Sequence, residues 1–291
     1  MIHTRNCLSA VRRLCRLALP AALAALLLTL NAGPALCGER PAPDPLGYIS
    51  NFWGDIKELP TKPLHWSRNQ WLLAEGVTGA TGVSLFFDEH IDDYFIKHRP
   101  EDLKDISNAL NDMGDSRYQV PYVAGMWTIG YAAGSMKMRK IAGDTMEASV
   151  IAGLMINPVL NYLTGRKLPV MGEPADKFRP FTWRRYSFPS GHAASAFALA
   201  AVLDVDLRDT FGYWHLPVVY GAALCVAESR LYNRAHYLSD VIAGSAIGWA
   251  VGTWVASKDR SGAQAPKEQE KPGPSLSLTP SVNGLYASLS F

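Results

Sequence analysis

The sequence predicts an all-α fold, a helical bundle of about six core helices with a short extended C-terminal tail. Apolar stretches alternate with polar joints, and they are rich in Ala, Gly, Leu and Met with few alternating β-branched runs, which favours helices over strands. Six such stretches in one region are typical of a helical bundle. They cover residues 71–87, 119–136, 146–163, 193–203, 214–227 and 241–256.

The N-terminal residues have the pattern of an export signal. Arg5, Arg12, Arg13 and Arg16 precede an apolar run of about 14 residues, which is short of the roughly 20 that span a bilayer. We therefore predict a cleaved signal peptide over residues 1–37, with an uncleaved anchor as the alternative. Export would place the protein in the periplasm or at the inner membrane, with its functional site facing the periplasm.

Removing residues 1–37 changes the charge balance of the chain. The full sequence has 28 basic and 26 acidic residues, and the remaining part has 24 and 26, a net charge of −2. The basic balance therefore belongs to the targeting segment, and we expect no nucleic-acid partner. Only Cys225 of the four cysteines remains, so the sequence predicts no disulfide framework.

Composition divides the rest of the chain into three parts. Residues 38–65 are rich in Pro and Gly without clear periodicity and are interpreted as a lead-in segment. Residues 66–257 form the predicted helical domain, large enough for one core. Residues 258–291 begin as a charged, Pro-containing linker and end in an alternating pattern around Asn283-Gly284, which predicts a small hairpin. Nothing in the sequence indicates an oligomeric state.

Two environments fit the helices. Glycines at 244, 248 and 252 on one helix face allow the close helix contacts of membrane proteins, although a tightly packed soluble bundle uses them too. Polar residues inside the stretches, such as Glu75 and Glu147, favour a soluble or peripheral protein. Basic clusters outside the stretches favour a membrane protein that keeps them on the cytoplasmic side. These clusters are Lys137, Arg139 and Lys140, and Lys258 and Arg260.

A first motif with chemical character is Ser187-Phe188-Pro189-Ser190-Gly191-His192, followed by an Ala-rich run. Ser190 is a suitable N-cap, and the Ala-rich run is a strong helix former. The free backbone N–H groups and the helix dipole at such an N-terminus favour phosphate binding, within reach of His192. Taken alone, an ordinary capped helix with an incidental histidine explains the motif as well.

A second motif is Ser229-Arg230, then His236 and Asp240. His236 and Asp240 are four residues apart and share a face if the segment is helical, so the carboxylate could fix the histidine tautomer and leave the other nitrogen nucleophilic. Arg230 offers a planar charged fork for phosphate oxygens. The alternative for this motif alone is an ion pair at a helix start with a structural arginine.

Together, the two motifs resemble those of the type 2 phosphatidic acid phosphatase and vanadium haloperoxidase superfamily, over about residues 145–257. The resemblance implies that His236 attacks phosphorus to form a phosphohistidine while Asp240 orients it. It implies that His192 is the general acid and base, and that Arg230, Ser190 and the Gly191 amide hold the phosphate oxygens. It implies no metal and no other cofactor.

The sequence departs from the family in an upstream motif, Lys-x6-Arg-Pro, whose two cations complete the phosphate site. Asn161 and Leu168 stand at the two cationic positions. We interpret Lys167 and Arg179 as their replacements, with Arg166, Lys177, Arg184 and Arg185 as further cations nearby. The alternatives are a weakened enzyme or an inactive one.

The resulting hypothesis is a metal-independent phosphatase of a phosphate monoester or pyrophosphate. The apolar helices favour a phosphorylated lipid over a small soluble ester as the substrate, and a membrane as its setting. An inactive envelope protein and a vanadate-dependent haloperoxidase are the alternatives. The acidic cluster of Asp88, Glu89, His90, Asp92 and Asp93 could bind a cation, but solvated charges at a helix end or loop are the simpler interpretation.

Overall fold

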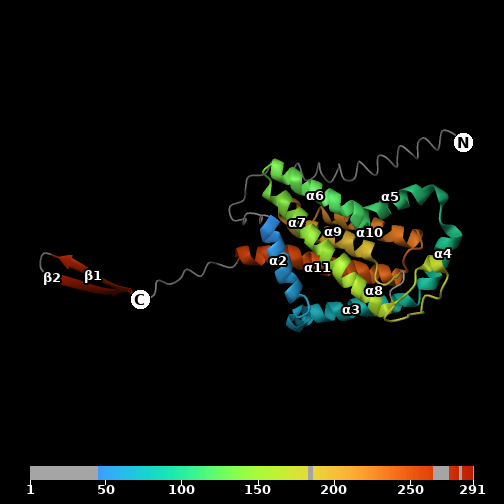
Figure 1. Cartoon of the computed structure of the whole chain (residues 1–291), viewed down its shortest axis with the longest axis horizontal. Coiled ribbons are helices and arrows are strands. Elements are labelled where there is room, and N and C mark those ends of the chain that lie inside the picture. The colour runs from blue at the N-terminus through green and yellow to red at the C-terminus, as the bar shows by residue number, and fades with distance from the viewer. Residues whose placement is uncertain (1–44, 183–185, 265–274, 282–283, 291) are drawn as a thin grey trace.

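The computed structural model describes residues 45–182, 186–264, 275–281 and 284–290, and it confirms the all-α fold (Figure 1). The predicted signal peptide lies outside the described residues. The helices are α2 (Pro45–Glu58), α3 (Arg68–Leu85), α4 (Asp88–His98), α5 (Lys104–Gly114), α6 (Ser116–Ala132), α7 (Met136–Ser149), α8 (Asn157–Thr164), α9 (Gly191–Phe211), α10 (Leu216–Tyr232) and α11 (Leu238–Gln264). Short 3-10 turns lie at Lys62–His65, Glu101–Leu103 and Pro169–Met171.

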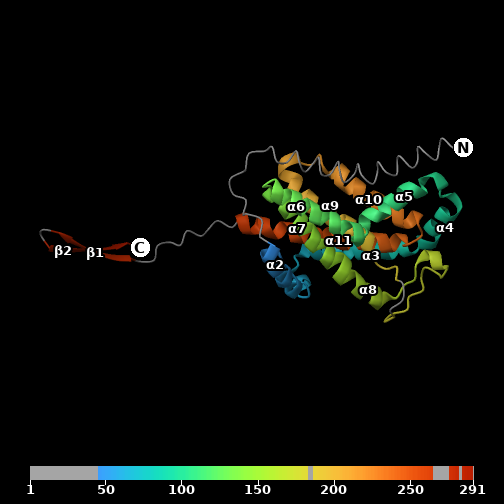
Figure 2. The ribbon, with the colours of Figure 1, turned by 45° about the horizontal axis from the view of Figure 1, so that its top comes forward.

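The core is built around α9, which packs against α7, α10 and α11 (Figure 2). Its small side chains, Ala194 and Ala198 among them, are fully buried. α11 lies along α9 so closely that a Cβ atom on Gly244, Gly248 or Gly252 would come within 2.5 Å of a backbone carbonyl oxygen of α9 or its N-cap. The glycine repeat is therefore required for this helix contact, and it fixes the N-terminal ends of α9 and α11 next to each other.

All six apolar stretches form helices, but the third is longer and less regular than predicted. α7 continues through a π-helical segment, Val150–Ile156, into α8. Pro158 has no N–H to donate to the carbonyl of residue 154, and its ring would clash there in an α-helix. The helix widens instead, and the Asn157 N–H donates to the Ala152 carbonyl, five residues back.

Three helices lie outside the six predicted stretches. α2 lies within residues 38–65, and its Phe52 packs on the core while Tyr48 stacks edge-on against Trp127. α4 and α5 are polar helices that precede α6 along the chain. α4 attaches mainly through charged side chains, whereas α5 turns a short apolar face, which includes Ala109 and Met113, toward the bundle.

The basic residues 137–140 lie inside α7 and not in a joint, so this part of the prediction is wrong. Lys140 pairs with Asp144 one turn on and with Asp206 of α9 at 2.9 Å. At the end of α11, Lys258 contacts Asp55 of α2. Asp206 and Lys258 follow Ser190 and Asp240 by four to five helical turns, so both clusters do lie at the opposite end of the bundle from the two motifs.

Within the described residues, two helical segments are long and apolar enough to cross a membrane, Met136–Met171 and Leu238–Lys258. The C-terminal tail forms the predicted antiparallel hairpin, in which β1 (Ser275–Ser281) pairs with β2 (Gly284–Ser290).

Candidate active site

The N-terminus of α9 forms one wall of the site. Ser190 is the N-cap, and its hydroxyl accepts a hydrogen bond from the Ala193 N–H at 3.4 Å. The Ser190 N–H donates to the Asp240 carbonyl at 2.9 Å, which ties this turn to the start of α11. The Ala194 N–H donates to the Ser190 carbonyl at 3.0 Å, so the amides of Gly191 and His192 are the two at this N-terminus that are left for an anion.

Arg230 and His236 come from the end of α10 and the turn after it. The N–H groups of Ala235 and His236 both donate to the Arg230 carbonyl, at 3.0 and 3.4 Å, so the chain folds back and keeps His236 next to Arg230. Both side chains are more than nine-tenths buried. Burial lowers the pKa of Arg230 to about 10, and the nearby Asp115 carboxylate partly offsets this effect.

His236 is oriented differently from the sequence-based prediction. α11 begins at Leu238, so His236 lies before the helix and shares no helix face with Asp240. Its Nδ1 lies 2.7 Å from the Ser187 carbonyl oxygen and 3.8 Å from Asp240 Oδ2. An N–H on Nδ1 therefore donates to Ser187, which leaves Nε2 as the unprotonated ring nitrogen. Asp240 acts on His236 through Ser187, whose hydroxyl binds Asp240 Oδ2.

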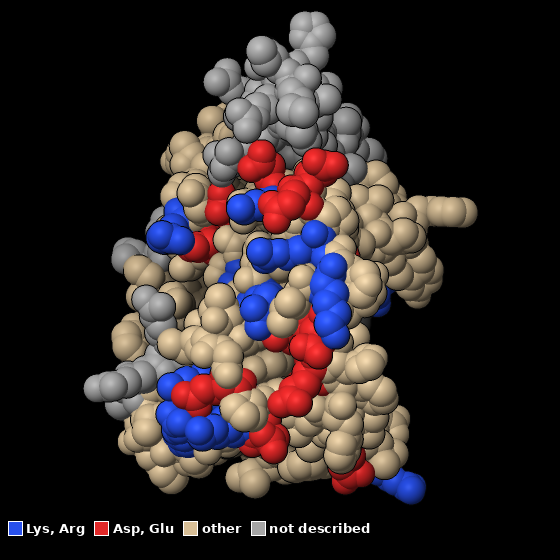
Figure 3. Space-filling view, turned by 90° about the vertical axis from the view of Figure 1, so that its right-hand side faces the viewer, with Lys and Arg blue, Asp and Glu red and all other residues tan. Residues whose placement is uncertain are grey.

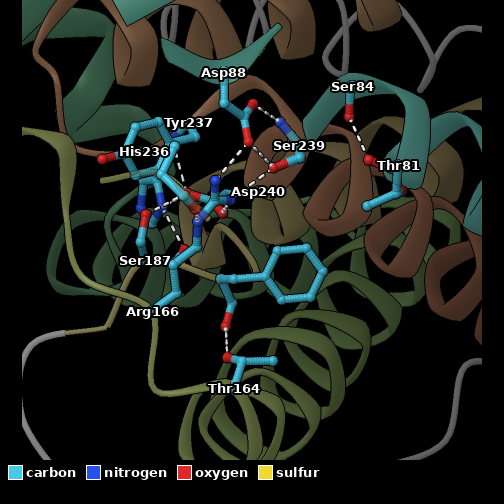
Figure 4. A network of polar contacts seen from close by, with 12 residues as sticks. Thr81, Ser84, Asp88, Thr164, Arg166, Ser187, His236, Tyr237, Ser239 and Asp240 are labelled. Atoms are coloured by element: carbon cyan, nitrogen blue, oxygen red, sulfur yellow. Dashed lines mark hydrogen bonds and ion pairs between the residues drawn. The ribbon is translucent and has the colours of Figure 1, made fainter. Parts of the chain in front are cut away.

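Asp240 belongs to a buried ionic network centred on Arg166 (Figure 4). One guanidinium nitrogen of Arg166 binds Asp240 Oδ1 at 2.5 Å and Ser239 Oγ at 2.7 Å, and the other binds Asp88 Oδ2 at 2.5 Å. Arg166, Asp88 and Asp240 are fully buried. Arg166 also lies over the Tyr237 ring, at 4.2 Å from its centroid. Arg166 therefore holds the second motif in place and has no free edge for a ligand.

The prediction of solvated charges at Asp88–Asp93 is wrong for two residues of that group. Asp88 also accepts the Ser239 N–H at 2.9 Å, and Asp92 forms a two-point ion pair with Arg234 at 2.7 and 2.8 Å. These contacts dock α4 onto the turn that carries His236. Among the described residues, no three His, Cys, Asp or Glu side chains are arranged to hold a metal ion.

His192 lies in the first turn of α9, close to Arg230 and His236. Burial, together with the positive charge of Arg230 and the proximity of His236, lowers the pKa of His192 to about 3. Asp115, the N-cap of α6, is 3.9 Å from His192 Nε2, and it forms a closer ion pair with Arg117 that keeps the pKa of the Asp115 carboxyl below its usual value. The resting site therefore has a neutral His192 beside a buried, charged arginine.

Residues 145–260, which contain both motifs, match the model of the PAP2 superfamily. This segment belongs to the PAP2 superfamily.

Two curated relatives of the PAP2 segment have lipid-phosphatase names. The chain is 30% identical to a lipid A 1-phosphatase of Porphyromonas gingivalis over 46% of its own length and 27% of the relative's. It is 31% identical to an undecaprenyl-diphosphatase of Sulfolobus acidocaldarius over 41% of its length and 54% of the relative's. The chain thus spans about a quarter to a half of these relatives. A crystal structure of a transmembrane PAP2 type phosphatidylglycerolphosphate phosphatase from Bacillus subtilis aligns with a TM-score of 0.47 and 18% identity, over 75% of this chain and 96% of that one.

The cations that we predicted to replace the missing PAP2 motif are both engaged by one carboxylate. Glu173 binds the Lys167 ammonium through Oε1 and the Arg179 guanidinium through Oε2 at 2.8 Å, and Lys177 approaches at 3.3 Å. The backbone of Glu173 is tied to the site, because its carbonyl accepts the Tyr237 hydroxyl at 3.0 Å. Arg184 and Arg185 lie outside the described residues.

Sequence reasoning missed the residues that support this PAP2 site. Ser187 was read only as the start of a motif, and Asp88 and Ser239 were assigned no part in it. A signal for Arg166 was present, because it follows Gly165, whose φ of +58° ends α8 with a left-handed turn. That turn directs the next side chain inward, under the site.

Figure 3 views the end of the molecule that carries α4, where Lys and Arg side chains gather beside Asp and Glu side chains.

Proposed function

We propose that the chain is a phosphatase that hydrolyses a phosphate monoester or pyrophosphate, with a phosphorylated lipid as substrate. One observation carries the proposal. Within the described part of the chain, the buried Arg230 Nε has no hydrogen-bond partner, and it lies near the free amides of α9 and both histidines. Buried donors are normally satisfied, so this arrangement fits a site that is completed by an anionic ligand.

In this proposal, the reaction proceeds in two steps. His236 Nε2 attacks phosphorus, a P–N bond forms, and the P–O bond to the leaving group breaks as that oxygen takes a proton from His192. His192 must first gain this proton, and the negative charge of a bound phosphate favours the protonated form of His192. Water then attacks phosphorus and gives a proton to His192, the P–N bond breaks, and inorganic phosphate leaves. Arg230 and the α9 amides stabilise the charge on the phosphate oxygens.

The lipid part of the proposal is supported by the names of the relatives and by the apolar helices around the site. The test is phosphate release from phosphatidic acid and from glycerol 3-phosphate, in EDTA. We expect the wild-type protein to release phosphate and His236→Ala to lose at least a thousandfold in rate, because the nucleophile is gone.

The matched control is His90→Ala, which changes an exposed histidine on α4 and should retain the wild-type rate. Loss of activity in EDTA would contradict a metal-independent reaction. Activity that persists in His236→Ala would exclude that residue as the nucleophile.

We further propose that Lys167 and Arg179 release Glu173 when substrate binds and then bind the phosphate oxygens of the substrate. Glu173→Gln removes the competing charge, so we expect it to lower the inhibition constant of inorganic phosphate severalfold. Lys167→Ala should raise that constant. Equal constants in wild type and both variants would show that these cations serve only to fold the loop.

A further inference from the structure

A cavity of about 180 Å³ opens beside His192. It lies between α6, the end of α7 with its π-helical segment, and the first turn of α9. Gly191 and His192 form part of its wall, and Asp115 lies at the same end. The rest of the exposed wall is mostly apolar, with side chains from Val120, Val123, Met146, Val150 and Leu154.

The position of the cavity decides which part of a substrate it can receive. In the proposed reaction, the phosphate lies against Arg230 and the α9 amides, and His192 protonates the oxygen of the departing alcohol. The group attached to that oxygen must therefore lie on the far side of His192 from His236, because attack and departure are in line. The cavity is adjacent to His192, so it can receive the group attached to the departing oxygen.

The chemistry of the cavity decides which alcohol fits. A polar alcohol such as glycerol would lose water contacts against the aliphatic side chains, which form most of the exposed wall, and could regain hydrogen bonds only at the polar lining residues Ser116, Gln119, Ser149 and Ser195. An apolar cavity of about 150 Å³ holds a benzene molecule, so about 180 Å³ holds roughly six carbons. We propose that the cavity binds the first apolar carbons of the leaving alcohol, and that it makes the enzyme selective for alkyl or isoprenyl phosphates. This inference rests on the proposed function.

The π-helical segment gives the cavity its shape. Val150 and Leu154 line it, and Gly153 lies between them with its Cα so close to α9 that a Cβ would be 3.0 Å from Ser195 Oγ. π-helical turns are rare and are often found at functional sites. Pro158, which follows this segment, has no N–H that a regular α-helix would need, so it is compatible with the wider turn.

The experiment is the chain-length dependence of hydrolysis. Ethyl, butyl, hexyl and octyl phosphates are compared with glycerol 3-phosphate, all soluble and without detergent. In the wild-type protein, we expect kcat/KM to rise about fourfold per methylene up to about six carbons and then to level off. A flat dependence would overturn the inference, because it would show that the alkyl chain stays in solvent.

Two variants fill the cavity. In Val150→Phe, the ratio of kcat/KM for hexyl phosphate to that for glycerol 3-phosphate should fall at least tenfold. Leu154→Trp repeats the test at a residue that is 57% exposed and tolerates a larger side chain in the fold. The control, Val218→Phe, makes the same change at an exposed residue of α10 away from the cavity and should keep the ratio.

Unchanged ratios in both cavity variants would overturn the inference while leaving the phosphatase activity intact. Failure of the wild-type protein to release phosphate from any ester, glycerol 3-phosphate included, would instead overturn the proposed function and this inference with it.

Discussion

His192 is neutral at neutral pH because it is buried next to the charged Arg230. The negative charge of a bound phosphate would let His192 hold a proton. With a pKa of about 3 in the folded protein and 6.5 in an unfolded chain, the unfolded chain binds more protons between these values. This group therefore makes the free energy of unfolding rise with pH up to about 6.5 and leaves it constant above. His192→Gln should remove this part of the slope in denaturant titrations.

Binding of phosphate should raise the pKa of His192 and cause proton uptake near neutral pH. Isothermal titration calorimetry in two buffers of different ionisation enthalpy measures this uptake. His192→Gln is the control, because it keeps the protonation of the phosphate itself. Equal uptake by both proteins would contradict the role of His192 as proton carrier.

Arg166 stabilises the fold through its buried ion pairs with Asp88 and Asp240. Arg166→Met leaves Asp88 and Asp240 buried without their partner, which should lower the free energy of unfolding by about 3–5 kcal/mol. It should also lower activity, since Asp240 no longer positions Ser187. Lys167→Met, the neighbouring change on a partly exposed ion pair, should cost less than about 1 kcal/mol. Chemical denaturation compares the two, and similar losses would argue against the network.

At the scale of elements, the contact between α9 and α11 is the most sensitive part of the bundle. A methyl group at residue 248 would lie about 2.0 Å from the Ala194 carbonyl oxygen, so Gly248→Ala must separate the helices and disturb the N-terminus of α9. We expect a marked loss of stability and of activity.

Gly221→Ala is the matched control for this substitution. It lies in α10 with no atom within 4 Å of the added methyl, and it should stabilise the helix by up to about 1 kcal/mol. Thermal unfolding of the two variants measures the difference. A stable, active Gly248→Ala protein would contradict the close contact.

The elements also explain which parts of the molecule the sequence could predict. The six apolar stretches follow from composition, and the two motifs are local enough that Ser190, His192, Arg230, His236 and Asp240 could be named from spacing. The ionic network could not be predicted, because Arg166 meets its two carboxylates across 74 and 78 residues and Ser239 meets Asp88 across 151. Spacing along the chain carries no information about such contacts.

At the scale of the whole molecule, α3 forms an exposed apolar surface. α3 is largely exposed although it is apolar, and only Ser84 in it is buried. Apolar side chains exposed along α3 and just after it are Trp71, Leu72, Leu73, Val83, Leu85, Phe86 and Phe87. Exposed apolar areas of this kind mark contact with a membrane or a partner protein.

We expect the protein to remain in the membrane fraction after washes with high salt and with alkaline carbonate, and to be released by detergent. A soluble periplasmic protein of the same cells is the control for complete lysis. Release by salt alone would instead place the protein at the membrane surface through charge.

The π-helical segment determines which way the side chains of α8 point. One extra residue in a helical turn rotates the rest of the helix by about 100° about its axis. Without it, α8 would continue α7 in phase, and Asn157 would turn away from α9, where its amide nitrogen now lies 3.1 Å from the position of a Cβ on Gly191. The segment therefore sets the rotation of α8 relative to α7. Deletion of a single residue within 150–156 would turn Asn157, and the loop after α8, away from the phosphate site.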